Sequence, residues 1–114
     1  MTFDEYQQKA ITTDTFGGKM TALDNHGFLE KAFGLVEESG EVAGKLKRIF
    51  REKDGKLTDS DKAEIIKEFG DVLWYISSLA YYLDVPFEEV AKQNLDKVLS
   101  RKSRGMTLGS GDNR

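Results

Sequence analysis

A single proline, Pro86, interrupts this chain of 114 residues, and no run alternates apolar and polar residues long enough to form a convincing strand. Apolar residues instead recur at helical spacing along most of the chain. The sequence therefore predicts an all-α protein, of the four-helix-bundle type. A chain of this length forms one ordinary domain, which we place at residues 1–104, followed by a glycine-rich, irregular tail at residues 105–114.

Capping residues and helix breakers predict where the helices begin and end. Thr2-Phe3-Asp4-Glu5 matches a capping box, and residues 58–61 offer caps for a long helix. Asp54-Gly55 is typical of a turn, and Pro86 is typical of a helix start. We expect helices from 3 to about 11, from about 28 to 50, from the caps at 58–61 to about 83, and from 86 to about 101, joined by a long loop at 13–26 and a polar turn at 51–57.

Apolar stripes on the two long helices predict the core. Between residues 28 and 50 the stripe recurs every seven residues, and we expect this side to face a partner helix: Leu29, Ala32, Val36, Ala43, Leu46 and Phe50. On the following helix we expect the stripe Ile65, Phe69, Val72, Leu73, Ile76, Ala80 and Leu83. After Asp71 that helix is apolar or aromatic on nearly every side. A chain this short can hardly cover all of these sides, so we expect a homodimer or homotetramer.

Composition excludes several classes of function. There are 17 Lys and Arg against 20 Asp and Glu, a net charge of −3, so nucleic acid and anionic membranes are not expected partners. The chain has no cysteine and one histidine, His26, which leaves carboxylates to carry any metal chemistry. We find neither a signal-peptide pattern nor an apolar stretch long enough to span a bilayer, and we expect a cytoplasmic protein.

Two pairs of acidic residues could form a metal site. Glu38 and Glu41 lie three residues apart on one predicted helix, and Glu68 and Asp71 lie three apart on the next. If the two helices pack antiparallel, the pairs sit at the same height and repel each other unless a cation joins them. Oxygen ligands of this kind select Mg²⁺ or Mn²⁺. The alternative is that these acids form two solvated helix faces.

Glycines beside the acids favour a crowded site over two solvated faces. Gly40 and Gly70 each lie within a predicted helix, where glycine costs roughly 1 kcal/mol relative to alanine. We therefore expect a close helix approach or a crowded site at these two positions. Other metal sites are excluded: a di-iron bundle needs two Glu-x-x-His pairs, and an EF-hand placed on Asp54-Gly55 would have Phe50 as its first ligand.

A group of polar and basic residues lies on one face of the last predicted helix. Asn94, Lys97 and Arg101 are spaced by three and four residues, so they share that face. Cations in the last turns of a helix are favoured by the helix dipole alone. The alternative is a phosphate clamp that works beside an acidic metal site.

The order of these motifs resembles the MazG-like nucleoside triphosphate pyrophosphohydrolases, relatives of the all-α dimeric dUTPases. Glu37, Glu38 and Glu41 match Glu-Glu-x-x-Glu, Glu68 and Asp71 match Glu-x-x-Asp, and Asn94 and Lys97 match Asn-x-x-Lys. The opening TFDEYQ and the closing RGMTLGSGDNR also resemble small stand-alone members, so that the resemblance covers nearly the whole chain.

The resemblance implies an oligomeric helical bundle that cleaves a nucleoside triphosphate, NTP or dNTP, to the monophosphate and pyrophosphate. It implies that Glu38, Glu41, Glu68 and Asp71 bind Mg²⁺ and that Glu37 positions or deprotonates the attacking water. Nucleotide-binding residues would be Asn94, Lys97 and Arg101. House-cleaning of noncanonical or surplus nucleotides is the expected role. The sequence does not identify the base, and it leaves two alternatives open: a non-enzymatic oligomeric adaptor and a nucleotide-binding regulator.

Overall fold

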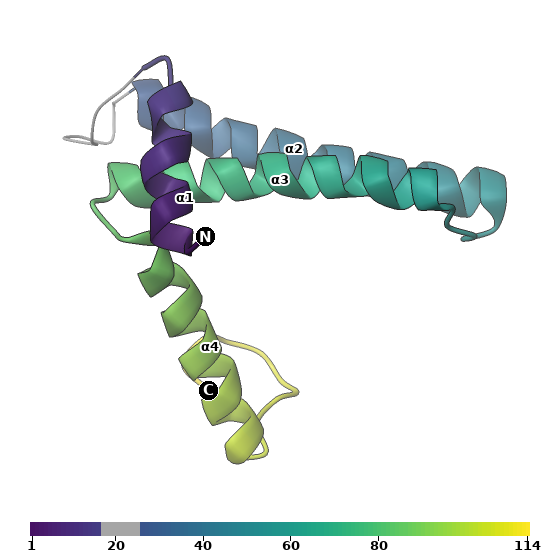
Figure 1. Ribbon diagram of the computed structural model, residues 1–114. Helices are drawn as coiled ribbons and strands as arrows, with labels where there is room; N and C mark the ends of the chain where they lie inside the picture. Colours follow the sequence, from purple (N-terminus) through teal and green to yellow (C-terminus); the bar gives the residue numbers. More distant parts are fainter. Residues whose placement is uncertain (17–25) are drawn as a thin grey trace.

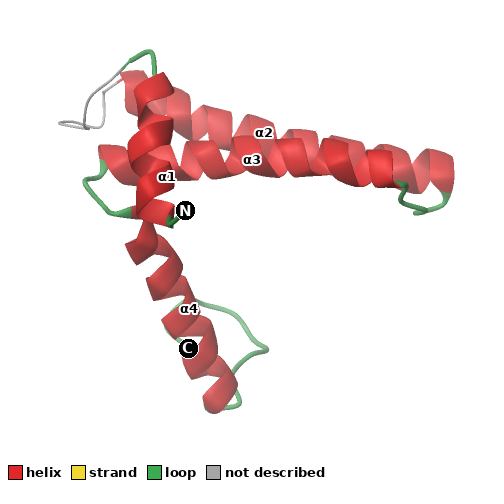
Figure 2. Ribbon diagram, viewed as in Figure 1, coloured by secondary structure: helices red, strands yellow, loops and turns green. Residues whose placement is uncertain are grey.

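The computed structural model describes residues 1–16 and 26–114. These residues form four α-helices and one short 3-10 helix, without a strand (Figure 2). The elements are α1 (Phe3–Ala10), η1 (Ile11–Thr13), α2 (His26–Lys53), α3 (Asp59–Tyr82) and α4 (Phe87–Ser103). The predicted all-α class is confirmed.

Two reciprocal capping boxes start α1 and α3 where the sequence predicts them. The Thr2 hydroxyl accepts a hydrogen bond from the Glu5 amide at 3.0 Å, and the Glu5 carboxylate accepts one from the Thr2 amide at 2.7 Å. Thr58 and Asp61 repeat this arrangement at the start of α3, at 3.1 and 3.0 Å. Both caps satisfy backbone donors that the first turn of a helix leaves without partners.

Helix α2 is longer than predicted at both ends. It begins at His26, which we assigned to the preceding loop, and residues 17–25 of that loop lie outside the described residues. It continues to Lys53 because residues 51–53 are good helix formers. Asp54 and Gly55 then adopt left-handed φ values of 54° and 74°, which a helix cannot continue. Helix α4 likewise extends past the predicted end, to Ser103.

The helices do not close into a four-helix bundle within one chain. Helices α2 and α3 pack side by side as an antiparallel hairpin, α1 crosses its open end, and α4 projects away from it (Figure 1). No described Cα of α2 comes within 8 Å of a Cα of α4. The radius of gyration is 16.9 Å, whereas a compact domain of this length measures about 13 Å.

The direction of α4 is fixed by α1. The buried Gln7 amide donates to the carbonyl of Val85 at 2.9 Å, and its oxygen accepts from the Phe87 amide at 3.2 Å. An acidic side chain of each helix also caps the first turn of the other helix. The Glu88 carboxylate accepts a hydrogen bond from the Phe3 amide, and the Asp4 carboxylate accepts one from the Glu88 amide. The projection of α4 is therefore built by specific hydrogen bonds at the α3–α4 junction.

Most of the predicted apolar stripe of α2 lies on the wrong side of the helix to pack against α3. Val36 is 71% exposed and Phe50 is 70% exposed, and Leu29 and Ala43 are exposed too. Ala32 and Leu46 of the predicted stripe are half-buried. The residues on the side of α2 that faces α3 repeat at helical spacing and include charged residues: Gly27, Lys31, Gly34, Glu38, Val42, Lys45 and Ile49. Of the core predicted at residues 65–83, Ile65 and Ala80 are buried, and Phe69 and Leu83 are exposed. Val72, Leu73 and Ile76 are half-buried. Polar groups thus occupy part of the hairpin interface.

Close helix approach occurs at Gly34 and Gly27 rather than at the predicted glycines. A Cβ added to Gly34 would lie 2.2 Å from the Tyr75 ring, and one added to Gly27 would lie 2.7 Å from the Tyr82 hydroxyl. At Gly40 and Gly70 an added Cβ would meet no described atom within 4 Å. Of the two alternatives for these positions, the close helix approach is therefore wrong for the single chain.

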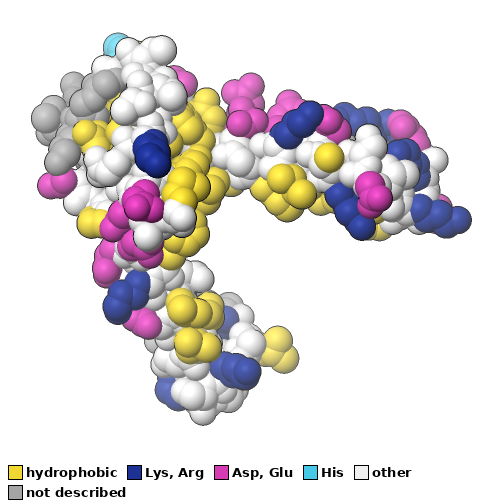
Figure 3. All heavy atoms as spheres, in the orientation of Figure 1, with side chains coloured by type: hydrophobic (Ala, Val, Ile, Leu, Met, Phe, Trp, Pro, Cys, Tyr) yellow, Lys and Arg dark blue, Asp and Glu magenta, His cyan; other side chains and the backbone are white. Residues whose placement is uncertain are grey.

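Large apolar side chains remain on the surface. Figure 3 shows many of them along the inner side of the elbow between the hairpin and α4. The more exposed ones on the long helices are Phe33, Val36, Phe50, Ile66, Phe69, Leu95 and Leu99. None of the described helices combines the length and apolar character needed to cross a membrane.

Candidate functional site

Three of the predicted metal ligands come together in the hairpin. One carboxylate oxygen from each of Glu38, Glu68 and Asp71 lies within 4.8 Å of the other two. Glu38 comes from α2, and Glu68 and Asp71 come from adjacent turns of α3. The antiparallel packing thus places acids of both helices at the same height. We call these residues the acidic trio.

The trio shows the electrostatics of crowded carboxylates. Burial raises the pKa of Glu38, and the charges of Asp71, Glu37, Glu68 and Glu41 raise it further. A carboxyl group with a raised pKa favours either a proton or a cation nearby. Oxygen-only donors fit Mg²⁺ or Mn²⁺.

Lys45 contacts the trio and is not among the site residues predicted from the sequence. Its ammonium lies 2.9 Å from a carboxylate oxygen of Glu68 and 3.5 Å from Glu64. The hydrogen bond to Glu68 is the main reason that the pKa of Lys45 is raised. Its position seven residues after Glu38 places both residues on the same side of α2, which is the signal that could have identified it.

Glu37 and Glu41 flank the trio on α2, and both are exposed. The trio does not include Glu41, the fourth predicted ligand, which lies one turn beyond Glu38. Glu37 faces a pocket of about 450 Å³ whose lining is largely apolar and aromatic: Phe16, His26, Leu29, Glu30, Phe33, Gly34, Glu37 and Tyr75. We call it the aromatic pocket, and it opens beside the trio because Glu37 is the neighbour of Glu38.

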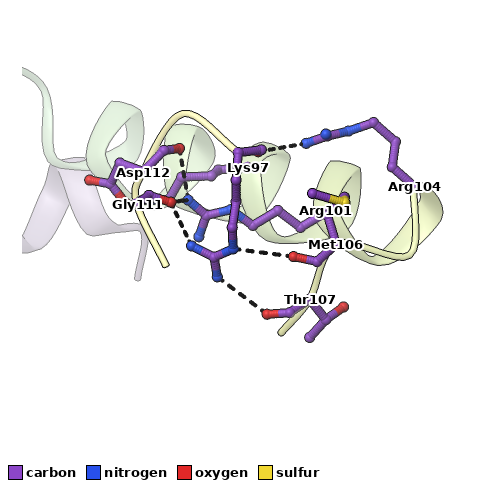
Figure 4. A network of polar contacts seen from close by, with 8 residues as sticks. Lys97, Arg101, Arg104, Met106, Thr107, Gly111 and Asp112 are labelled. Carbon is purple, nitrogen blue, oxygen red and sulfur yellow. Dashed lines mark hydrogen bonds and ion pairs between the residues drawn. The ribbon is translucent and has the colours of Figure 1, made fainter. Parts of the chain in front are cut away.

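The predicted nucleotide-binding residues of α4 lie away from the acidic trio. Asn94 is exposed and borders a separate shallow pocket together with Lys97. Arg101 is only 8% exposed, and its guanidinium bonds to the tail (Figure 4). Lys97 lies 3.2 Å from Asp112 of the same tail. The tail is irregular as predicted, and it folds back onto α4.

One chain does not assemble the whole predicted site. Glu37, Glu38 and Glu41 belong to α2, and Asn94, Lys97 and Arg101 belong to α4. These helices make no contact within the described residues, and α4 points away from the hairpin (Figure 1). Acids and cations can meet only if a second chain supplies one of the two groups or if α4 moves.

Two curated proteins are similar to this chain. The "Gene 37 protein" of Mycobacterium phage L5 is 43% identical over 114 residues, which cover the whole of both chains. The "Uncharacterized protein YpjD" of Bacillus subtilis (strain 168) is 37% identical over 67 residues, 59% of this chain and 60% of that protein. No solved structure matches the chain.

A protein-family model also matches most of the chain. The MazG nucleotide pyrophosphohydrolase domain matches residues 29–106, which contain the acidic trio, Glu37, Glu41, Lys45 and the polar face of α4. The resemblance seen in the sequence motifs is thereby confirmed. This chain belongs to the MazG nucleotide pyrophosphohydrolase family.

Proposed function

We propose that this protein is a cytoplasmic Mg²⁺-dependent pyrophosphohydrolase that cleaves NTP or dNTP to the monophosphate and pyrophosphate, in a house-cleaning role. The observation that carries the proposal is the convergence of Glu38, Glu68 and Asp71 inside the segment that matches the family. Hydrolysis of a phosphoanhydride bond needs positive charge beside the phosphates. Three carboxylates at this spacing are suited to bind a divalent cation that supplies this charge.

The acidic trio would hold Mg²⁺, with Mn²⁺ as a substitute, and Glu41 would join through its exposed side chain. A bound divalent ion supplies positive charge that stabilises the leaving pyrophosphate. Lys45 holds Glu68 at 2.9 Å and thereby orients one ligand. A hydrogen bond to a metal-binding carboxylate usually affects metal affinity as well as ligand geometry.

Glu37 is the proposed general base. It lies next to the trio and is exposed in the wall of the aromatic pocket, so that substrate and water can reach it. It would take a proton from water as the water oxygen attacks the α-phosphorus. The bond from the α-phosphorus to the bridging oxygen then breaks, and the electron pair leaves with pyrophosphate.

The aromatic pocket is the proposed site of the base. A nucleobase presents flat apolar faces, and aromatic side chains such as Phe33 and Tyr75 stack on such faces. A volume of about 450 Å³ is within the range of small-molecule sites. Because Glu37 is part of the lining, a base held there has its phosphates near the trio.

We further propose that the complete site is shared between subunits of a homodimer or homotetramer. Exposed apolar residues on α2, α3 and α4 provide surface for association, and the elbow keeps α4 away from the acids of its own chain. A second copy would bring Asn94, Lys97 and Arg101 to the trio. This arrangement accounts for a family motif that one chain leaves divided.

Pyrophosphate release tests the proposal. We would screen NTPs, dNTPs and modified nucleotides with Mg²⁺ and measure pyrophosphate, with Glu38→Gln as the inactive control. A protein that releases none across the panel is not this enzyme. Thermal shift then separates the alternatives: a regulator is stabilised by Mg²⁺ with nucleotide without hydrolysis, whereas an adaptor shows no such shift.

A further inference from the structure

A single carboxylate oxygen of the tail lies between two cations of α4. Asp112 Oδ1 is 3.2 Å from Lys97 Nζ and 3.3 Å from Arg101 Nη2 (Figure 4). The hydrogen bond from Lys97, followed by the one from Arg101, lowers the pKa of Asp112. Asp112 is therefore ionised at neutral pH. An anionic oxygen bridging Lys and Arg is the contact that a phosphate oxygen makes in a phosphate site.

Arg101 has features of a built anion site. Its side chain is 10% exposed, and Nη2 donates to the carbonyl oxygens of Asp112 at 2.7 Å and Gly111 at 3.2 Å. Its Nε is buried and has no hydrogen-bond partner among the described residues. A buried donor without a partner costs free energy, and an incoming anion with several oxygens would satisfy more donors than one carboxylate oxygen.

Apart from the part-buried bonds of Arg101, the polar contacts that order the tail are exposed, and most of them lie within the tail itself. Arg114 donates to the carbonyls of Met106 at 3.3 Å and Thr107 at 3.2 Å, and Arg104 donates to the Arg114 carbonyl at 3.0 Å. Leu108, the one leucine of the tail, is 91% exposed and does not anchor it. Exposed polar contacts of this kind contribute little to stability.

We propose that Asp112 is an internal competitor that occupies the phosphate-binding cations Lys97 and Arg101 until the triphosphate of a nucleotide displaces the tail. This inference rests on the proposed function, because it assigns the triphosphate as the displacing anion. It makes the tail an autoinhibitory element: the apparent affinity for triphosphate is reduced by the fraction of molecules with the tail closed.

Tripolyphosphate binding to the full chain, measured by calorimetry without a divalent ion, tests the competition. We expect Asp112→Asn to bind tripolyphosphate about two- to fivefold more tightly than the wild type, the range expected when one exposed ion pair is removed. Asp96→Asn is the matched control, because Asp96 is an exposed carboxylate of α4 paired with Lys92 at 2.6 Å. Each variant removes one negative charge, so the net charge of the protein changes equally in both.

Two results would overturn the proposal. Equal affinities of Asp112→Asn and Asp96→Asn would mean that the tail does not compete, and weaker binding by Asp112→Asn would mean that Asp112 helps to build the site. Asp112 is 81% exposed, so the variant should fold. Trypsin gives a second reading: tripolyphosphate should speed cleavage after Arg104 in the wild type, and protection there would also contradict competition.

The outcome is separable from the proposed function. Tighter binding by Asp112→Asn without pyrophosphate release from any nucleotide would uphold the competition and reject the enzyme. Hydrolysis with the same KM in the wild type, Asp112→Asn and Asp96→Asn would uphold the enzyme and reject the competition.

Discussion

The ammonium of Lys31 lies 2.7 Å from Asp14 Oδ1, and both side chains are buried. Lys31 also bonds to Glu30 and sits 5.1 Å from the ring centroid of Phe16 and 5.6 Å from that of Trp74. The Tyr82 hydroxyl donates to the other oxygen of Asp14. This buried pair ties the turn after η1 to α2 and α3, and it holds Phe16 at the wall of the aromatic pocket.

Removing one partner of this pair should destabilise the protein strongly. Asp14→Asn leaves the Lys31 ammonium buried beside an uncharged amide, and we expect a loss of about 3 kcal/mol in the free energy of unfolding. The matched control is Asp59→Asn, because Asp59 is fully exposed and lies 3.8 Å from Lys62. Urea unfolding at pH 7 should separate the two variants. Equal midpoints would show that the buried pair does not stabilise the fold.

The same pair should make stability depend on pH. Burial opposes the ionised form of Asp14, but hydrogen bonds from Lys31, Tyr82 and the Phe16 amide outweigh it, so its pKa is lowered. A lowered pKa stabilises the fold above the ordinary value of about 4, and this contribution is lost as the pH falls through the folded-state pKa. We therefore expect the stability difference between the wild type and Asp14→Asn to narrow from pH 6 to acid. If the difference in free energy of unfolding between the two proteins did not change with pH, ionised Asp14 would not be the source of this stability.

Two glycines of α2 should respond to alanine in opposite directions. Gly34→Ala places a methyl group 2.2 Å from the Tyr75 ring, and we expect a loss of about 1–3 kcal/mol. Gly40→Ala meets no described atom within 4 Å, so the helix propensity of alanine should raise stability by up to about 1 kcal/mol. Thermal or urea unfolding measures both. The packing described for α2 would be wrong if Gly34→Ala were the more stable variant.

The metal assignment predicts opposite effects on activity and stability. Asp71→Asn removes one acid of the trio, so we expect Mg²⁺-dependent pyrophosphate release to fall at least 10²-fold. Without metal the same variant should be as stable as the wild type or more stable, because a repulsive charge is gone. Glu52→Gln is the control, since Glu52 is an exposed acid of α2 paired with Arg51. Near-normal turnover of Asp71→Asn would remove Asp71 from the metal site.

A shared site predicts complementation between inactive subunits. Glu38→Gln disables the acids, Lys97→Gln disables the cations, and a randomly mixed dimer should regain about a quarter of the wild-type activity. Half of the dimers are mixed, and one of their two sites then combines intact acids with intact cations. Mixing Glu38→Gln with Asp71→Asn is the control and should regain nothing, because both changes affect the acids. A mixture that stays inactive would place acids and cations in the same chain.

The starts of α1 and α3 and the turn at Asp54-Gly55 were predictable because they depend on neighbours in the sequence. The capping boxes at Thr2 and Thr58 and the stop at Asp54-Gly55 use hydrogen bonds and φ values that four or five adjacent residues determine. The spacing of Glu68 and Asp71 likewise fixed their common helix face. The same local rules, together with the antiparallel hairpin, brought Glu38 to these acids.

The inward face of α2 and the direction of α4 were decided only by the tertiary structure. Hydrophobic periodicity pointed to Val36 and Phe50, but the hairpin buries Lys31 and half-buries Lys45, whose charges are balanced by Asp14 and Glu68 from other segments. No pattern within α2 shows that such partners exist. The course of α4 depends in the same way on hydrogen bonds with Gln7, about 80 residues earlier in the chain. Local sequence sets backbone conformation, whereas the rotation of a helix about its axis depends on distant groups that satisfy its buried polar atoms.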